Sequence, residues 1–525
     1  MNDIHALVRS LSKPQVKLVR AYLSGFSVRK DENTRFMQLF DYLLAQKDAS
    51  PTKEETAIAL YGKPNMNTYE RLKNRFKFKI YDVLTLDLNI DRKDKLDEVD
   101  YMSARLKKRF LQFQILYRTN GNNSLTRQLI DDIISLSLKY EVYEVLLAAL
   151  RFRKYFKGFC KGLSDFKAVN REIAFYDYAQ VASQKANDLY YQLIMWDNFH
   201  KSVGGGKKQE FIKEAILDLK KDYRYTKSAI VAYYLKLMEM AYFEEEGEYV
   251  AARQASLEML ELLKENKSVY RKQRLGITFL NLCLYDAYLE NFSQAVSNAR
   301  SAVKFVPYGS TNYFIGKEQE FLAAFYGNLN EFTHMALAEL QKAGKKQHGD
   351  FRVDKYNYYQ TCLLFKEGKH KEALKELNTH LDISRDKTGW EISVRVLAIM
   401  SNIELQRFDE AALLVENLRK HAERNKKGKM EISQRDAHII RILVDLSRKG
   451  FMFNTLGEKT LLALGRLAGN DKKLRWQPFG AELIPFHEWM IAKIPAKSGA
   501  MITAKEKVKP VKRKKDFVLA EMQKN

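Results

Sequence analysis

Two short segments of the chain have the outline of reactive sites. Gly158-Phe159-Cys160-Lys161-Gly162 has the glycine spacing of a nucleophile elbow, but that elbow needs a preceding strand, and a helical pattern rich in Leu and Arg precedes it here. Gly204-Gly205-Gly206-Lys207-Lys208 suggests a phosphate loop, but it lacks the required glycine-to-lysine spacing and has no Ser or Thr after the lysine. We therefore interpret Cys160 as an ordinary thiol in a helix–helix turn and residues 204–208 as a loop.

The remaining ionisable residues do not assemble a metal site or an acid–base site. No two of the nine histidines have metal-ligand spacing with an acidic partner, and His370 and His380 are too far apart on one helix to share an ion. The carboxylates are spread along helix faces, where solvated or i,i+4 paired roles are the rule. We predict no catalytic residues, no metal and no cofactor, and we expect that the chain is not an enzyme.

Composition narrows the class of protein further. The 525 residues include 89 Lys and Arg against 65 Asp and Glu, a net charge of +24, and 46% are hydrophobic. This balance is typical of a folded globular protein. Three scattered cysteines (Cys160, Cys283 and Cys362) exclude a disulfide scaffold and suit a reducing compartment. The longest apolar run, residues 229–235, is too short to cross a membrane, and the charged N-terminus is unlike a secretory signal, so we expect a cytoplasmic protein.

Proline is scarce, and this favours helix. Only Pro307 occurs between Pro64 and Pro478, and proline breaks helix interiors. Apolar residues recur at spacings of three and four, as in Ile439, Ile440, Leu443 and Leu446, whereas alternating runs with hairpin turns are absent. The sequence predicts an all-α fold.

One turn recurs in the second half of the chain. A turn residue is followed, usually, by an aromatic residue and then by a small residue in the next helix. The copies are Gly247-Glu248-Tyr249 then Ala252, Asn291-Phe292 then Ala295, Asn330-Glu331-Phe332 then Met335, Gly368-Lys369-His370 then Ala373, and Arg407-Phe408 then Ala411. The turn residue ends one helix, the aromatic ring fills the gap, and the small residue lets the two helices approach closely.

This pattern resembles the tetratricopeptide repeat over about residues 227–425. In the best copy, residues 279–307, Cys283 takes the small crossing position, Ala295, Ala299 and Ala302 form the small stripe, and Pro307 closes the unit. The copies are 43, 40, 38 and 38 residues apart, whereas the family repeats every 34, so the likeness is divergent. The alternative is an irregular helical bundle with coincidental alanines.

The resemblance implies an α-solenoid, a tetratricopeptide-like superhelix of antiparallel helix pairs whose first helices line a concave groove. It places several side chains near that groove, and Tyr234, Tyr288, Tyr358 and Met400 are the proposed partner-binding residues. The others are Leu237, Ile277, Leu280 and Val396. Each could equally be a plain core residue.

The N-terminal region, residues 1–98, is expected to be a separate helical module. Thr52 and Glu55 form a capping-box pattern, Asn67 and Glu70 form a variant of it, and a helix from Thr68 to about Leu88 follows. Two helices joined by a short turn are typical of a helix-turn-helix. The cations of the second helix could neutralise phosphates, and they are Arg71, Lys73, Arg75, Lys77 and Lys79. A structural cap for the solenoid would look the same.

The rest of the chain divides into three parts. We expect the solenoid over residues 99–475, a C-terminal helical cap over residues 476–496 and a disordered basic tail over residues 497–525. From these expectations we predict a non-enzymatic scaffold that binds a peptide or helix of a partner protein in the solenoid groove, and the net positive charge favours an acidic partner. The alternative is a nucleic-acid-associated regulator that uses the basic N-terminal helix and the tail.

Overall fold

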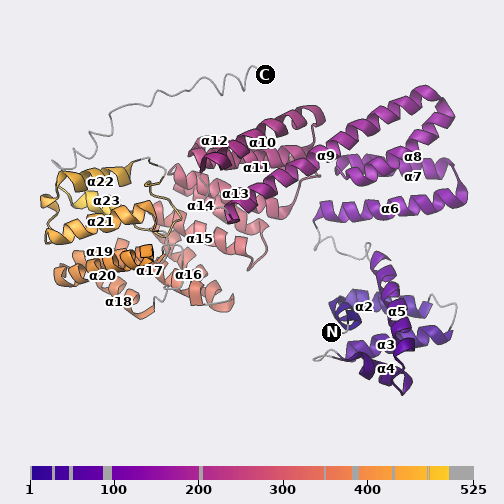
Figure 1. Ribbon diagram of the computed structural model, residues 1–525, viewed down its shortest axis with the longest axis horizontal. Coiled ribbons are helices and arrows are strands. Elements are labelled where there is room, and N and C mark those ends of the chain that lie inside the picture. Colours follow the sequence, from indigo (N-terminus) through magenta and orange to yellow (C-terminus); the bar gives the residue numbers. More distant parts are fainter. Residues whose placement is uncertain are drawn as a thin grey trace. The chain divides into compact units, whose positions relative to one another are not determined.

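A computed structural model describes residues 3–25, 30–46, 51–86, 97–199, 205–347, 350–380, 390–427, 432–469, 471 and 473–495. Every regular element in these ranges is a helix, which confirms the predicted all-α class (Figure 1). The described residues fall into two compact units. The first contains those within Met1–Ser202, Glu214–Leu235 and Leu262–Arg271, and the second contains those within Val203–Lys213, Lys236–Glu261 and Lys272–Asn525.

The first five helices have a hydrophobic core of their own. They are α1 (Asp3–Ser10), α2 (Lys13–Gly25), α3 (Lys30–Ala45), α4 (Lys53–Tyr61) and α5 (Met66–Leu86). The predicted capping box is present at α4, because Thr52 Oγ1 accepts from the N–H of Glu55 at 3.1 Å while Glu55 Oε2 accepts from the N–H of Thr52 at 2.8 Å. The predicted cap at Asn67 is wrong. The capping side chain belongs to Asn65, whose Oδ1 accepts from the N–H of Thr68 at 3.3 Å.

The rest of the first unit begins as a succession of helices, each packed on the next. These are α6 (Glu98–Asn120), α7 (Ser124–Lys139), α8 (Tyr143–Lys161) and α9 (Leu163–Phe199). Glu141, in the turn between α7 and α8, has a left-handed backbone (φ 49°). Its carboxylate accepts from the N–H of Ala229 at 2.8 Å, from Ser228 Oγ at 2.5 Å and from Ser268 Oγ at 3.2 Å. The turn is thereby anchored to the first residues of α11 and to a second loop.

The second unit contains the most regular array. Three helices contribute residues to both units, and they are α10 (Gly205–Thr226), α11 (Ala229–Glu246) and α12 (Tyr249–Glu265). The array continues through α13 (Lys272–Tyr288), α14 (Phe292–Phe305), α15 (Thr311–Tyr326), α16 (Asn330–Gln347), α17 (Asp350–Lys366), α18 (His370–His380), α19 (Trp390–Glu404), α20 (Phe408–Lys427), α21 (Gln434–Arg448) and α22 (Glu458–Ala468). From α13 on, each helix packs on the next, and α13 also contacts α15 as α17 contacts α19. This succession of antiparallel pairs is an α-solenoid, as predicted.

The recurring turn has the same backbone geometry in all five copies. A left-handed residue ends the first helix of each pair, and these residues are Gly247, Glu290, Asn328, Gly368 and Gln406. The N–H of the next residue donates to the carbonyl five positions earlier, as Glu248 does to Phe243 at 2.9 Å. These bonds satisfy carbonyl groups that the helix end would leave without partners.

The third copy is shifted from the predicted register. Its left-handed residue is Asn328, so the small position falls on Thr333, which is 1% exposed. Met335, the residue predicted for this position, has a side chain that is 53% exposed. The register differs because asparagine occurs at both 328 and 330, and only the left-handed backbone at Asn328 shows which of them ends the helix.

Small residues let the helices of the array pack closely. Ala295, Ala299 and Ala302 are fully buried, as the predicted stripe requires. Gly276 has the same role on α13, because a Cβ there would lie 2.5 Å from Val306 Cγ1. Only small residues permit these close contacts, and the dense packing that results stabilises the array.

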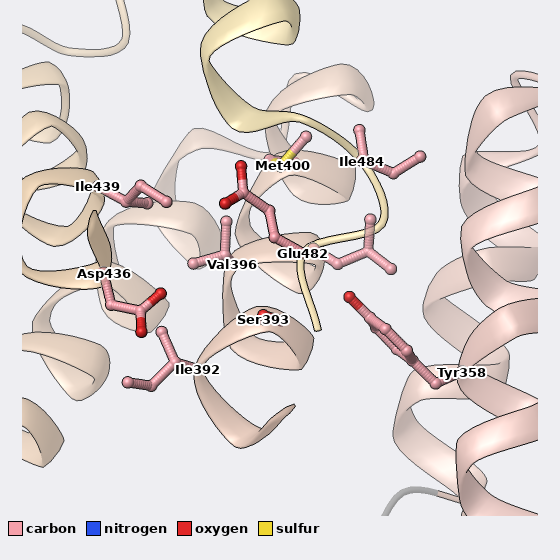
Figure 2. Close-up of a pocket in the computed structure, with 10 residues that line it drawn as sticks. Tyr358, Ile392, Ser393, Val396, Met400, Asp436, Ile439, Glu482 and Ile484 are labelled. Atoms are coloured by element: carbon pink, nitrogen blue, oxygen red, sulfur yellow. The ribbon is translucent and has the colours of Figure 1, made fainter. Parts of the chain in front are cut away.

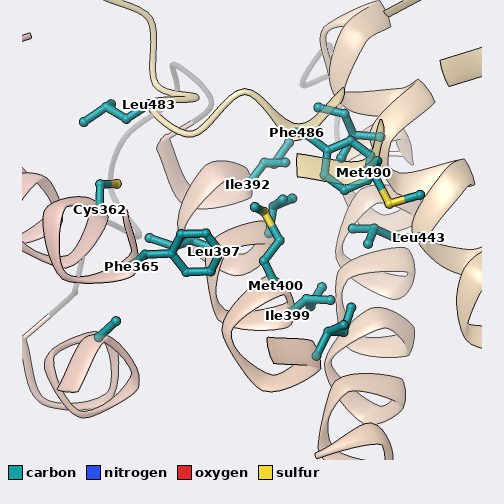
Figure 3. Packing of buried hydrophobic residues seen from close by; sticks show 14 of the residues in the cluster. Cys362, Phe365, Ile392, Leu397, Ile399, Met400, Leu443, Leu483, Phe486 and Met490 are labelled. Carbon is teal, nitrogen blue, oxygen red and sulfur yellow. The ribbon is translucent and has the colours of Figure 1, made fainter. Parts of the chain in front are cut away.

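The array ends in a segment that folds back onto it. After α22, residues 473–485 lead to α23 (Phe486–Lys493), and Leu483, Phe486 and Met490 join one hydrophobic core that extends from Phe321 to Ile494 (Figure 3). A short 3₁₀ helix (Phe453–Thr455) connects α21 and α22. The predicted basic tail, residues 497–525, lies outside the described residues.

Candidate partner-binding groove

A groove of about 1130 Å³ lies in the second unit, between the recurring turns and the returning segment. Its first wall comprises turn residues of five successive helix pairs, from Gly247 to Glu404, and its second wall comprises residues from Leu467 to Trp489. Eight aromatic side chains line it: Tyr249, Tyr288, Phe292, Phe325, Tyr326, Phe365, Trp476 and Trp489.

One end of the groove is a stacked aromatic pair capped by a cation. The rings of Tyr249 and Tyr288 are nearly parallel, with centroids 4.0 Å apart. Arg475 donates from Nη2 to Tyr249 Oη at 2.8 Å, and its guanidinium carbon lies 5.3 Å from the Tyr249 ring centroid. A Cβ at Gly247 would lie 2.7 Å from Arg475 Nη1, so a larger residue at this positive-φ position would displace the end of the Arg475 side chain. Burial raises the pKa of Tyr288, so its hydroxyl is neutral at physiological pH.

The second wall is held by one buried arginine, Arg435 of α21, which is 8% exposed. Its Nε and Nη2 bind the two carboxylate oxygens of Glu482. Its Nη1 donates to the carbonyls of Leu467, at 3.0 Å, and Leu474. Its Nη2 also donates to Nδ1 of His487 at 3.0 Å. All five N–H donors of the guanidinium are therefore used, and together they fix the returning segment at several points.

Arg435 also sets the charge states around it. Burial and the neighbouring Arg435 charge lower the pKa of His487 to about 4, so this ring is neutral and can accept a hydrogen bond at Nδ1. Glu482 Oε1 also accepts from the N–H of Phe486 at 2.7 Å, at the start of α23. One carboxylate thus joins α21 to the first turn of α23.

The far end of the groove has a similar polar anchor. Glu404 Oε1 accepts from Trp489 Nε1 at 2.6 Å, and the Lys493 ammonium lies 2.8 Å from the same carboxylate. Burial acts to raise the pKa of Glu404, but the hydrogen bonds from Lys493 and Trp489, together with the charges of Lys493 and His370, lower it. Trp476 donates from Nε1 to the carbonyl of Glu482 at 2.8 Å and packs edge-on against Tyr326. The aromatic side chains of the second wall are therefore held in fixed orientations.

The groove carries negative charge in a chain whose net charge is strongly positive. Four carboxylates line it (Glu246, Glu290, Glu404 and Glu488) against two cations, Lys366 and Arg475. Of these carboxylates, Glu246, Glu290 and Glu488 make no ion pair or side-chain hydrogen bond with another described residue. Burial, together with the nearby carboxylates of Glu290 and Glu482, raises the pKa of Glu488. A cationic group in the groove would relieve this repulsion.

Of the four predicted partner-binding residues, only Tyr288 lines the groove. Tyr234 belongs to the first unit, where its hydroxyl donates to Asn187 Oδ1 at 2.5 Å. Tyr358 and Met400 are buried, at 2% and 1% exposure, and line a small pocket of about 10 Å³ that the returning segment covers with Glu482 and Ile484 (Figure 2). Tyr358 donates to the carbonyl of Ala481, in the same segment, at 3.1 Å.

The other residues predicted to line the concave groove do not line the groove along the turns, which we call the turn groove. Leu280 and Val396 are buried, Leu237 is half-buried, and Ile277 is 37% exposed. The reason is that the cavity lies along the turns and not along the first helices of the pairs.

The basic residues predicted to bind nucleic acid lie on two flanks of α5. Arg71 and Arg75 are exposed, whereas Lys73, Lys77 and Lys79 are half-buried. Lys73 forms an ion pair with Glu70 at 2.5 Å, Lys77 lies 5.9 Å from the Tyr81 ring centroid, and Lys79 lies 5.5 Å from that of Tyr22. Between the flanks, Phe78 is 68% exposed.

The two motifs that suggested reactive chemistry lie on helices. Cys160 is exposed in the last turn of α8, with helix before it and not strand. Gly205 to Lys208 lie in the first turn of α10, while Gly204 is outside the described residues. In the described ranges there is no group of three His, Cys, Asp or Glu residues placed to hold a metal ion. None of the described helices is long and apolar enough to cross a membrane.

Sequence reasoning did not find Arg435 or the acidic side chains of the groove. Arg435 did leave a signal, because it occupies the buried stripe of α21 four positions before Ile439 and eight before Leu443. The unpaired carboxylates left none, because their common location depends on contacts between distant parts of the chain.

No protein-family model matches the chain, and no curated protein matches its sequence.

Proposed function

We propose that this chain is a non-enzymatic scaffold that binds an extended segment of a partner protein in the groove along its turns. The observation that carries the proposal is the groove itself: a long cavity of about 1130 Å³, lined by eight aromatic side chains held on two fixed walls. Rigid aromatic side chains supply large contact area at low entropic cost, and they dominate binding energy at protein interfaces.

The dimensions support an extended occupant. The groove follows the turns of five successive helix pairs, so a segment that fills it must run along several turns and cannot sit at a single one. The three unpaired carboxylates favour a segment that carries Lys or Arg, not the acidic one that net charge suggested.

Other features agree with a binding role. Burial raises the pKa of the Cys283 and Cys362 thiols, which disfavours the reactive thiolate. The three free cysteines suit a cytoplasmic location. The common turn geometry supports a distant relationship to tetratricopeptide repeats, although its spacing is longer.

A capture experiment tests the proposal. The tagged full chain would be used to isolate partners from a lysate of its own organism, with and without nuclease. We expect protein partners that survive nuclease and are lost with Glu290→Lys/Glu488→Lys. A matched charge change outside the groove, Glu261→Lys/Glu372→Lys, should retain them. Equal capture by both variants would reject the groove as the binding site.

The second candidate function is nucleic-acid binding through α5. The exposed Phe78, on the same exposed face of α5 as Arg71 and Arg75, favours it, because a single-stranded base can stack on an aromatic ring that has cations beside it. The test is the salt dependence of single-stranded oligonucleotide binding by the full chain. Arg71→Gln/Arg75→Gln should reduce the slope by about 1.4 if both side chains contact phosphates. An unchanged slope would reject this role for α5.

A further inference from the structure

A second groove lies at the end of the array, over α20, α21 and α22, and its volume is about 620 Å³. It belongs to the same unit as the turn groove but shares no lining residue with it. The largest share of its lining comes from α21, so α21 forms the floor while α20 and α22 contribute the sides.

Both α21 and α22 present a helical stripe to this groove. On α21 the stripe consists of Ala437, Ile440, Arg441, Val444 and Arg448. On α22 it consists of Lys459, Leu462, Ala463 and Arg466. These spacings of three, four and seven place each set on one helix face. Each stripe therefore combines apolar side chains with cationic ones.

The cations of the groove are available to a ligand. Arg441, Arg448, Lys459 and Arg466 are exposed and make no ion pair or hydrogen bond through their side chains with another described residue. A fifth cation, Arg419, is engaged by Glu416 and Glu423 on its own helix. The two lining carboxylates are also engaged, since Glu423 binds Arg419 and Asp445 accepts from Thr460 Oγ1. The groove thus has an excess of unpaired positive charge.

The apolar part of the groove indicates which acidic ligand fits. Leu462 is 42% exposed, and Ile432, Val444 and Ala463 are half-buried around it. No Phe, Tyr or Trp lines the groove, and its one ring is the half-buried imidazole of His438, whose Nδ1 lies 2.8 Å from the carbonyl oxygen of Gln434. The groove therefore offers little surface on which a base could stack. A helix with apolar residues on one face and carboxylates beside them would cover the floor and pair with the cations.

We propose that this groove is a second docking site, and that its occupant is an acidic amphipathic helix of a partner protein. The site is independent of the turn groove, and a chain that failed to bind an extended segment there could still bind this helix. The charge of the two grooves is opposite, so each would select a different partner segment.

The test is a selection from a random 16-residue displayed peptide library on the immobilised full chain, repeated on Arg441→Glu/Arg448→Glu. We expect enriched peptides in which Asp or Glu accompanies Leu, Ile or Val at spacings of three and four. The variant should bind the best peptide at least tenfold more weakly, and Leu462→Ser at least threefold. The milder Arg441→Gln/Arg448→Gln and far-UV circular dichroism would separate lost binding from lost fold.

Matched controls make the result decisive. Lys304→Glu/Lys371→Glu, which reverses two exposed lysines elsewhere in the same unit, should change affinity less than twofold. Peptides without acidic enrichment, or equal losses in both double variants, would overturn the proposal. The proposal would also be overturned if a 20-nucleotide single strand bound more tightly than the best peptide and lost this binding in Arg441→Glu/Arg448→Glu. That result would identify nucleic acid as the ligand.

Discussion

Replacing Arg435 should release the returning segment while leaving the rest of the array folded. Arg435→Met leaves the Glu482 carboxylate, 15% exposed, without its cation, and leaves the carbonyls of Leu467 and Leu474 without a donor. Breaking a buried ion pair by removing one partner costs about 3–5 kcal/mol. A cost of about 4 kcal/mol corresponds to roughly a 1,000-fold loss of protection from hydrogen exchange, since about 1.4 kcal/mol is tenfold.

Amide hydrogen exchange read by mass spectrometry measures this effect locally, which matters because a chain of two units need not unfold in one step. The amides of α23 (Phe486–Lys493) should lose protection by about this factor, and those of α13 should be unchanged. Arg435→Lys should recover only part of it, because an ammonium cannot satisfy a bidentate carboxylate and two carbonyls together. Arg419→Met, which removes only surface ion pairs, should leave the protection of α23 unchanged. Protection of α23 within threefold of wild type in Arg435→Met would show that Arg435 does not hold the returning segment in place.

Three further predictions follow from the same contacts. The folded pKa of His487, about 4, lies below its unfolded value of about 6.5, so its contribution to the free energy of unfolding is present above pH 6.5 and is lost as pH falls toward 4. In urea unfolding at pH 4 to 7, His487→Asn should remove up to about 3 kcal/mol of this pH dependence, and an unchanged profile would contradict the pKa assignment. Glu141→Ala should cost about 2 kcal/mol by removing the acceptor of the Ala229 N–H, and Glu141→Gly should cost about 1 kcal/mol less because φ is positive, as read by exchange at the start of α11. Gly276→Ala should destabilise α13 by about 1–2 kcal/mol through its clash with Val306, and an increase in melting temperature would show that helix propensity outweighs the clash.

Features encoded by neighbouring residues could be predicted from the sequence. The capping box at Thr52 and the turn at Gly368 each depend on a few consecutive residues whose backbone preferences are strong. Where two nearby residues have the same side chain, local preferences do not tell which of them has the role. The helix cap is Asn65 and not the predicted Asn67, and the turn residue is Asn328 and not the predicted Asn330.

The site was harder to predict because it depends on the chain folding back on itself. Tyr358 was expected in an open groove, yet a segment more than a hundred residues later covers it and accepts its hydrogen bond. Tyr288 was also expected in the concave groove, and it lines a cavity that lies along the turns and has Arg475 on its other side. Periodicity identifies which face of a helix is apolar, but it does not tell whether another helix, a returning segment or a partner covers that face.

A partner segment that occupies the groove along the turns must slow amide exchange in the residues that line it, and a hydrogen-exchange footprint of the full chain with and without a captured partner measures this. We expect slower exchange at the turns around Gly247, Glu290, Asn328 and Gly368 and along residues 473–489, with no change in α5. The Glu290→Lys/Glu488→Lys variant should show no footprint at the same partner concentration. Protection confined to α5, or to helix faces outside the groove, would show that the partner binds elsewhere.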